Sequence, residues 1–310
     1  MLEQSVTTAG TRALTRRRQF AGPLAEALFF ACAALAIVTS IGIVAVLVTE
    51  ALPFFRSEGV SLLSFLTGTQ WAPMIGRFGV LPLVTATVVI SAIAMLVATP
   101  LGLGAAIYLS EYAAPQARQI LKPTLELLAG VPTIVFGYFA ITLLSPTLQA
   151  AFTPERVSIY NMAAAGLAMG LMLTPLVASM SEDALRAVPR SLREGSAALG
   201  ATNLETTLFV VLPAALSGIV ASLIVALSLA IGETTIVSIA AGAGPNLTLN
   251  PLASAETMTG HIARIAGGDL SHGSVDYLSI FAIGLLLFVI TLTLNLASQA
   301  IVRRFREVYE

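Results

Sequence analysis

The chain has 310 residues, of which 56% are hydrophobic and only 11% are charged, and its mean hydropathy is +0.89. Soluble domains carry about a quarter charged residues, so this composition excludes an ordinary soluble domain and indicates a membrane protein. The net charge of −1 says little, because the charges are segregated along the chain. The single cysteine, Cys32, excludes an intrachain disulfide and a cysteine-based metal site.

Six uncharged stretches, each longer than the roughly 20 residues that a spanning helix needs, predict six transmembrane helices. They are 27–49, 78–110, 127–154, 157–181, 206–232 and 277–302. The predicted fold class is therefore an all-α membrane protein. A further uncharged run, 234–255, is broken by glycine and proline, so we predict that only its start is helical and completes the fifth span.

The orientation follows from the basic residues. Six spans place both termini and the loops 111–126 and 181–205 on one side, and that side carries twelve of the 16 lysines and arginines. The excess predicts that this side is cytoplasmic. We expect residues 1–22 to form a loose cytoplasmic tail and 304–310 a cytoplasmic C-terminus. The apolar run at 23–52 is too long for a signal peptide, so it is predicted to be an uncleaved first span.

Two segments are expected outside. The periplasmic loop 53–77 holds aromatic side chains typical of a membrane interface, namely Phe54, Phe55, Phe65 and Trp71, with Phe78 just beyond it. The second loop, 242–275, contains a stretch at 253–265 that predicts a short helix lying at the surface.

The polar residues of these outer segments are interpreted as solvated. His261 and His272 lack the histidine–carboxylate spacing of zinc sites, so we expect surface residues rather than metal ligands. Arg77 and Arg264 are interpreted as isolated charges, and contact with an anion or a delivery protein is the alternative.

The stretch 181–213 carries seven charges between two apolar runs, so it must face water. Pro189 suits a first helical turn, and Ser191 with Glu194 fits a capping box. Gly200 is a natural left-handed stop, and a second box of Thr202 with Glu205 starts another helix. This order of helix, glycine hinge and helix is typical of a surface that docks a partner.

The spacing in this stretch resembles the signature loop of bacterial ABC importer permeases. Glu194 is followed six residues later by Gly200 and, after nine more residues, by Val210, Leu212 and Pro213, while Gly195 and Ser196 replace the two alanines of the pattern and Val210 its isoleucine. The alternative is an ordinary amphipathic loop of another membrane protein. In the family the loop docks into a cytosolic ATPase. The resemblance implies that role for Pro189, Arg193, Glu194, Gly195, Ala198, Gly200, Asn203, Leu212 and Pro213.

Other segments are similar to phosphate importer permeases. They are 78–113, 121–140 and 230–242, and the ending 272–310 resembles the PstC type rather than its PstA partner. The resemblance covers about 65–310 and implies a type I permease fold with its core at 78–303. The family commonly has an arginine four residues before the glutamate of its fifth span, where this chain has Leu229.

The resemblance also implies an assembly in the bacterial inner membrane. A PstA-type permease, two ATPase subunits and a periplasmic or lipid-anchored phosphate-binding protein would be the partners, with inorganic phosphate as substrate. Permeases for molybdate, sulfate or phosphonate share the loop, so these oxyanions stay open. An ion-coupled secondary carrier and a non-transporting scaffold or sensor are further alternatives, which would leave 181–213 or the many glycines and prolines unexplained.

An oxyanion pathway needs hydrogen-bond donors, which broken helices supply. Gly130, Pro132 and Thr133 interrupt the third span, and the alternative is a simple packing kink. Glu233 repels phosphate, so we expect it to be protonated, to pair with a partner cation or to orient Thr234 and Thr235; the alternative is a wetted residue at the outer interface.

No G-x-x-x-x-G-K-[ST] motif and no Ser/His/Asp, Cys/His or HExxH set occurs in the sequence. We therefore expect a transport subunit that is not an enzyme and binds neither cofactor nor metal, with ATP bound by a partner ATPase. Nucleic acid is not an expected partner.

Overall fold

The computed structural model describes residues 4–57, 59–268, 271 and 273–305, with the side chains of 25–300 within these ranges. It divides into two compact units, 1–50 and 51–310, which are described separately. In the described part, six helices are long and apolar enough to cross a membrane: Ala25–Arg56, Leu81–Tyr112, Thr133–Phe152, Met162–Arg186, Asn203–Gly232 and Val275–Ala300. The prediction of six spans is confirmed.

The elements run in the following order. They are α1 (Gln4–Arg56), α2 (Leu62–Thr67), β1 (Trp71–Ala72), the short helix η1 (Pro73–Ile75), β2 (Arg77–Phe78), α3 (Leu81–Ile107), the π-helical turn η2 (Tyr108–Tyr112), α4 (Pro115–Ala129), α5 (Thr133–Phe139), the π-helical turn η3 (Ala140–Leu144), α6 (Ser145–Phe152), α7 (Met162–Arg186), α8 (Arg190–Ala198), α9 (Asn203–Thr206), the π-helical turn η4 (Thr207–Val211), α10 (Leu212–Gly232), α11 (Thr235–Ala240), α12 (Met258–Ala266) and α13 (Val275–Phe305).

Several predicted boundaries were wrong. Residues 4–22 are not a loose tail but the first part of α1, and most of the expected loop 111–126 is helix α4. The third span begins at Thr133 rather than at 127, because the chain breaks before it. The start of the 234–255 run is helical as expected, but it forms the separate helix α11, because Glu233 is extended at the end of α10.

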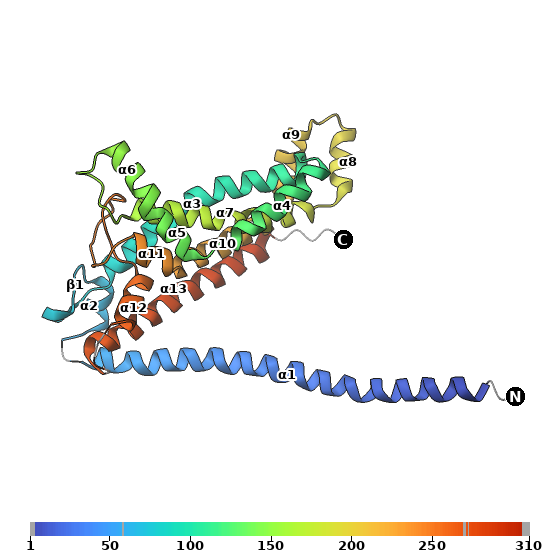
Figure 1. Ribbon diagram of the computed structural model, residues 1–310, viewed down its shortest axis with the longest axis horizontal. Coiled ribbons are helices and arrows are strands. Elements are labelled where there is room, and N and C mark those ends of the chain that lie inside the picture. Colours follow the sequence, from blue (N-terminus) through green and yellow to red (C-terminus); the bar gives the residue numbers. More distant parts are fainter. Residues whose placement is uncertain (1–3, 58, 269–270, 272, 306–310) are drawn as a thin grey trace. The chain divides into compact units, whose positions relative to one another are not determined.

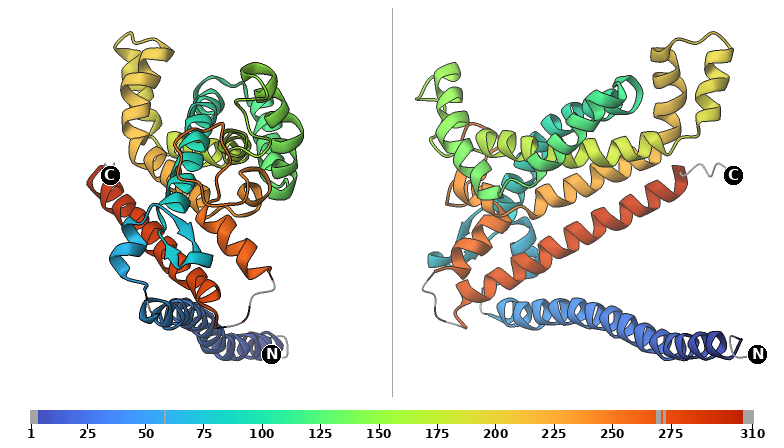
Figure 2. Two further views of the ribbon diagram at one scale, coloured as in Figure 1. Left: turned by 90° about the vertical axis from the view of Figure 1, so that its left-hand side faces the viewer. Right: turned by 45° about the vertical axis from the view of Figure 1, so that its right-hand side comes forward.

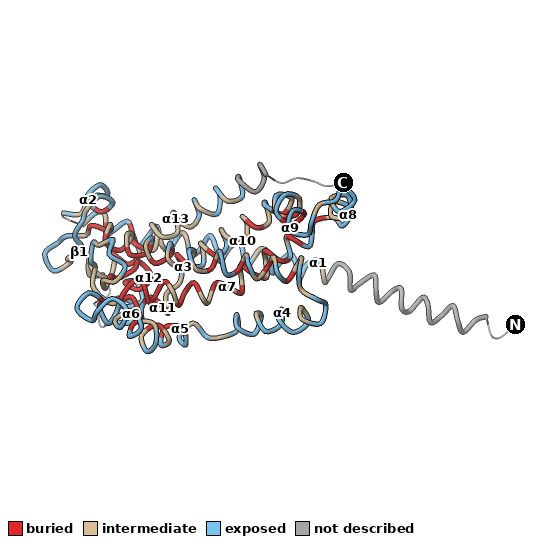
Figure 3. Tube along the Cα trace, turned by 90° about the horizontal axis from the view of Figure 1, so that it is seen from above, coloured by how far each residue is buried: buried red, intermediate tan, exposed pale blue. Residues whose placement is uncertain are grey.

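The core of the second unit lies between α3 and α7. Figure 3 shows buried residues along both helices, whereas α4 is exposed. Small residues allow the close approach: a side-chain Cβ at Gly102 would lie 2.7 Å from Val177, and one at Gly170 would lie 2.7 Å from Val97. Such small-residue contacts replace the hydrophobic driving force that lipid does not supply between helices.

The bundle of the second unit has two distinct ends. Helices α8 and α9 lie at one end, and α2, the β1–β2 hairpin, α6 and α12 lie at the opposite end (Figures 1 and 2). The antiparallel hairpin pairs Trp71 with Phe78 and Ala72 with Arg77. The loop 181–213 and the two segments expected outside therefore lie at opposite ends, as the predicted topology requires.

The aromatic residues of the 53–77 segment do not face a membrane interface as expected. Phe54, Phe65 and Trp71 are buried and pack edge-on with Phe55 and Phe78. Edge-to-face pairs of this kind add about 0.5–1.5 kcal/mol each beyond area burial. The segment is thus folded rather than an open loop, and its aromatic cluster shares a core with Leu83 of α3, Met258 of α12 and Ile283 of α13.

Candidate coupling site and substrate pathway

The 181–213 stretch folds as the predicted helix, glycine hinge and helix. Gly200 has φ +86°, the left-handed conformation expected of a helix stop. The second capping box is present: Thr202 Oγ1 accepts from the Glu205 N–H, and Glu205 Oε2 accepts from the Thr202 N–H at 2.8 Å. The first box, predicted at Ser191 and Glu194, is wrong, because α8 starts one residue earlier and its N-cap position is Pro189.

Helix α8 has two unlike faces. Leu192, Arg193 and Ser196 face inward, and the Ser196 hydroxyl lies 2.9 Å from the Thr206 hydroxyl, which joins α8 to α9. The opposite face exposes Glu194, Gly195, Ala197, Ala198 and Leu199. Leu199 is 91% exposed, and in the described part of the chain Glu194 forms no ion pair. The side chains of Glu194 and Leu199 are therefore available for contact with another protein.

Arg193 joins α8 to the ends of two spans. Its Nε and Nη2 donate to the two oxygens of Glu111 in η2, at 3.1 and 2.8 Å. Its Nη1 and Nη2 also donate to the backbone carbonyls of Val188 and Leu185, at 2.7 and 2.9 Å, where α7 ends. Glu111 is thus the anchor of the loop. Asn203 begins α9, and Leu212 and Pro213 lie in the first turn of α10.

A cavity of about 330 Å³ lies beside this ion pair. Its lining comprises Glu111, Arg193, Glu194, Ala197, Asn203, Thr206 and Thr207. Three of the nine predicted coupling residues, Arg193, Glu194 and Asn203, therefore meet at one place. The loop thus has an exposed surface and a cavity that extends to the Arg193–Glu111 ion pair.

Glu182 forms a second ionic cluster at the same end. Its side chain is fully buried and accepts from Arg118 and from Lys122, whose Nζ lies 2.7 Å away. Arg186 lies 3.8 Å from the same carboxylate, and Lys122 also bonds to Asp183 at 3.1 Å. The hydrogen bond from Lys122 to Glu182 raises the pKa of that ammonium group. The cluster fixes the otherwise exposed α4 to α7.

The predicted break at Gly130–Thr133 is present. Helix α4 ends at Ala129, Pro132 occupies the N-cap of α5 with φ −57° and ψ 137°, and Thr133 starts α5 half-buried. A proline before a helix removes one backbone donor and leaves the next N–H groups free. The span therefore offers donors at its start, next to a polar hydroxyl.

Glu233 stands at the break between α10 and α11. Its carboxylate accepts from the backbone N–H groups of Thr235 and Ile236, at 2.8 and 3.2 Å, and its carbonyl accepts from Thr259 at 2.7 Å. It therefore caps α11 and orients Thr235, which is one of the roles predicted. Thr234 bonds back to Gly232 at 3.3 Å. The pathway candidates thus lie at two helix breaks, on α5 and α11, which pack together.

The outer segment holds a buried cluster that the sequence reading missed. Glu256 accepts from Arg264 Nε at 2.6 Å, from the Gly244 N–H at 3.2 Å, and contacts His261 Nδ1 at 3.2 Å. Burial raises the pKa of Glu256, but the bonds to His261 and Arg264 outweigh it and lower that pKa to about 2. The hydrogen bond to Glu256 raises the pKa of Arg264.

This cluster corrects three expectations. His261 is 2% exposed rather than solvated, and Arg264 is paired rather than isolated. The predicted surface helix is α12, whose first turn, Met258–His261, is buried. His272 lies outside the described residues. The missed signal is that the carboxylate of Glu256, just before the N-cap Thr257 of α12, is only five and eight residues from His261 and Arg264.

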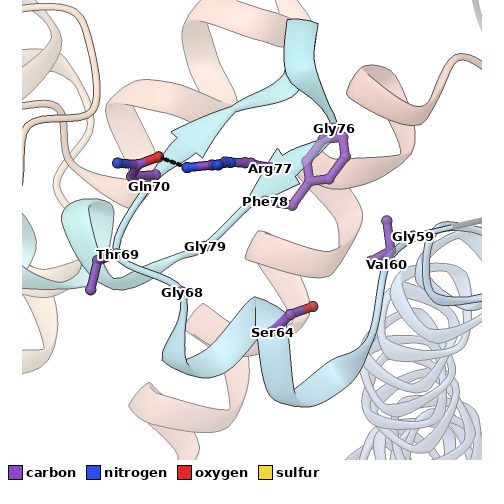
Figure 4. Close-up of a pocket in the computed structure, with 10 residues that line it drawn as sticks. All are labelled: Gly59, Val60, Ser64, Gly68, Thr69, Gln70, Gly76, Arg77, Phe78 and Gly79. Atoms are coloured by element: carbon purple, nitrogen blue, oxygen red, sulfur yellow. Dashed lines mark hydrogen bonds between the residues drawn. The ribbon is translucent and has the colours of Figure 1, made fainter.

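An outer pocket of about 410 Å³ lies between α2 and the β1–β2 hairpin (Figure 4). Among its ten lining residues Arg77 is the charged one, and its guanidinium already donates to Gln70 across the hairpin. A Cβ at Gly79 would lie 2.3 Å from the Gly68 backbone, so glycine lets the two segments touch. Arg77 is thus bonded rather than isolated.

Six helices long enough to span a membrane, a helix break at the start of one and at the end of another, and an exposed helix bonded to the ends of two spans are features typical of a membrane transport permease. The family model described as "Binding-protein-dependent transport system inner membrane component" matches residues 98–307. The chain belongs to that family.

Proteins of similar sequence are also named as transport permeases. The chain is 33% identical over 263 residues to the "Probable ABC transporter permease protein YqgH" of Bacillus subtilis, covering 84% of each chain. It is 33% identical to the "Phosphate transport system permease protein PstC" of Mesorhizobium japonicum, covering 77% of this chain and 78% of that one. It is 32% identical to PstC 1 of Mycobacterium tuberculosis, covering 83% and 86%.

Solved structures show the same fold. A bacterial ABC transporter of alginate import matches with a TM-score of 0.58 at 15% identity, covering 87% of this chain and 90% of that chain. An inward-facing MetNI methionine ABC transporter matches with a TM-score of 0.55 at 20% identity, covering 77% and 100%. The chain therefore has the type I permease fold of ABC importers, and the fold expected from the sequence is confirmed.

Proposed function

We propose that this chain is a transmembrane subunit of an ATP-driven importer of inorganic phosphate. The observation that carries the proposal is α8, whose outer face is free while its inner face is bonded to the ends of α3 and α7. A partner that pulls on such a helix moves the spans with it. The printed names of the relatives from Mesorhizobium and Mycobacterium support phosphate as the substrate.

The partners follow from this role. A second permease of the PstA type would complete the pathway, two ATPase subunits would bind ATP and contact α8, and a periplasmic or lipid-anchored binding protein would deliver phosphate. The α8 end and both termini would then face the cytoplasm, in a bacterial inner membrane. The excess of basic residues on that side supports this orientation.

We place the pathway at the two helix breaks. Gly130 and Pro132 would break the span so that Thr133 and the following N–H groups supply donors at the start of α5, and Thr234 and Thr235 would supply donors beside α11. Glu233 would act by holding the first turn of α11 in place, because its carboxylate already accepts two backbone N–H groups. Such a role removes the difficulty of a carboxylate that would otherwise repel phosphate.

The energetics explain why ATP is needed. Each negative charge that enters against 100 mV, inside negative, costs about 2.3 kcal/mol, so a dianion costs about 4.6 kcal/mol. A thousandfold gradient adds about 4.1 kcal/mol. Without coupling to a spontaneous reaction, phosphate would flow outward.

The test is uptake of labelled phosphate into proteoliposomes that hold the chain with its partner permease, ATPase and binding protein. We expect uptake that requires ATP and resists excess sulfate and molybdate. Uptake of another oxyanion in place of phosphate would overturn the substrate assignment alone. Uptake without ATP that collapses with the ion gradient would overturn the importer class and favour a secondary carrier.

A further inference from the structure

Arg193 and its neighbour Glu194 both line the cavity beside α8, but they differ in exposure and in bonding. Glu194 is exposed, whereas the side chain of Arg193 is 23% exposed and reaches Glu111, which is 10% exposed. Arg193 and Glu111 are 82 residues apart in the sequence, so their hydrogen bonds join the loop to a distant span. The inward residue therefore has a task that differs from contact with a partner.

We propose that Arg193 is the positioning residue that makes α8, the inner end of α3 and the inner end of α7 move as one body. The proposal rests on the proposed function and deepens it, because it names the bond by which movement of the docked helix reaches the spans. Glu111 is the matching residue on η2.

The geometry supports a stiff connection. The guanidinium is planar, and two of its nitrogens hold both oxygens of Glu111, an arrangement that fixes direction as well as distance. The same group bonds the carbonyls of Leu185, in the last turn of α7, and of Val188, just after that helix. Helix α8 cannot tilt without carrying both partners or breaking four hydrogen bonds.

Leu192 of α8 packs against the apolar cluster that includes Ala106 and Leu185, and a second polar connection of α8 is weaker than the charged one. Ser196 and Thr206 share a neutral hydroxyl bond of 2.9 Å, and it leads only to α9. Charge-assisted bonds are about twice as strong as neutral ones. Glu111 also lies in a π-helical turn, a local irregularity that is frequent at functional sites. The charged link is thus the rigid route from α8 to the second span.

The experiment compares Arg193→Ala, Glu111→Ala and the double variant in the complete reconstituted complex. For each, phosphate uptake, ATP hydrolysis and the amount of co-purified ATPase are measured. We expect the ratio of phosphate transported to ATP hydrolysed to fall about tenfold, as loss of a charge-assisted pair implies, while the ATPase stays bound. The double variant should be no worse than Arg193→Ala.

Glu126→Ala is the matched control, since it removes an exposed carboxylate on α4 at the same end of the bundle. It should leave the ratio unchanged. An unchanged ratio in Glu111→Ala would overturn the inference, and so would parallel loss of bound ATPase and hydrolysis, which would make the pair part of the docking surface. Failure of the parent complex to import phosphate with ATP would instead overturn the proposed function.

A covalent replacement separates positioning from folding. In a Cys32→Ser background, which has no other cysteine, Glu111→Cys and Arg193→Cys are joined by a short bismaleimide. We expect cross-linking to restore the ratio that the uncross-linked double variant lacks. Cross-linked protein that stays uncoupled, with its ATPase bound, would show that α8 must move relative to α3 and would contradict the inference.

Discussion

Two glutamates are buried at opposite ends of the bundle, and their partners come from different distances along the chain. Glu182 is paired with Arg118 and Lys122, 64 and 60 residues away on another helix. Glu256 is held by Gly244, His261 and Arg264, all within 12 residues. Both carboxylates are at most 2% exposed, so loss of the partners would leave a buried polar group without hydrogen bonds.

The difference assigns them different structural roles. The Glu182 cluster joins α4 to α7 at the end that carries α8, and therefore fixes how helices are arranged. The Glu256 cluster closes one local segment between α11 and α13. We expect loss of the Glu182 cluster to destabilise the whole bundle, and loss of the Glu256 cluster to destabilise mainly the outer segment.

The largest effect is expected from Glu182→Ala. It leaves Arg118 partly buried without a carboxylate and leaves Lys122 with the exposed Asp183 alone, and removing one partner of a buried pair costs about 3–5 kcal/mol. Thermal unfolding of the purified complex measures the loss. Asp183→Ala is the control, because Asp183 is 67% exposed and makes one bond to Lys122, so it should cost under about 1 kcal/mol. Equal losses in both variants would contradict the distinction.

The outer cluster should respond to acid. The pKa of Glu256 is lowered from its usual value near 4.5 to about 2, so its stabilising contribution is complete above pH 4.5 and disappears as the pH falls through about 2. Glu256→Gln should lose this dependence. The measurement is the unfolding midpoint between pH 5 and 2, and identical curves for the two proteins would refute the assignment.

Two of the left-handed glycines, one at each end of the bundle, offer the next comparison. Gly200 has φ +86° at the coupling end and Gly76 has φ +69° in the outer hairpin, and a Cβ at either would meet open space. Leucine at each costs about 1–2 kcal/mol of local strain. We expect Gly200→Leu to uncouple ATP hydrolysis from uptake, whereas Gly76→Leu should keep the two coupled. Normal uptake by Gly200→Leu would argue against docking at α8.

The smallest effects are expected at two capping boxes. Thr202 caps α9 at the inner end, and Ser61 caps α2 at the outer end, where its side chain accepts from the Ser64 N–H at 3.0 Å. Alanine at either should cost about 1 kcal/mol. Hydrogen exchange should quicken in α9 for Thr202→Ala and in α2 for Ser61→Ala. If hydrogen exchange quickened in both α9 and α2 in either variant, the two ends of the bundle would not be independent of each other.

Local signals in the sequence were sufficient for much of this structure. Six apolar runs predicted six spans, and the positive φ of Gly200 and the Thr202–Glu205 box followed from residue type and spacing. The same rule failed at Ser191 and Glu194, because Pro189 had already started the helix. Capping patterns compete, and only the backbone decides which one forms.

Ion pairs between residues far apart in the sequence could not be predicted from such local signals. Arg193 meets Glu111 and Glu182 meets Arg118 across more than 60 residues, and no local pattern announces such partners. The prediction that His261 and Arg264 are solvated was wrong for a different reason. Their partner Glu256 was near enough to find, but polar residues in a loop were assumed to be solvated.

The most direct test is site-specific cross-linking from α8 to the ATPase. In the Cys32→Ser background, Ala197→Cys on the exposed face of α8 and Met74→Cys at the fully exposed hairpin tip are compared in the intact complex. Cross-linking to the ATPase from position 197 alone, strengthened or weakened by ATP, is the predicted result. Cross-linking from position 74, or none from 197 in a complex that hydrolyses ATP, would contradict the coupling role of this loop.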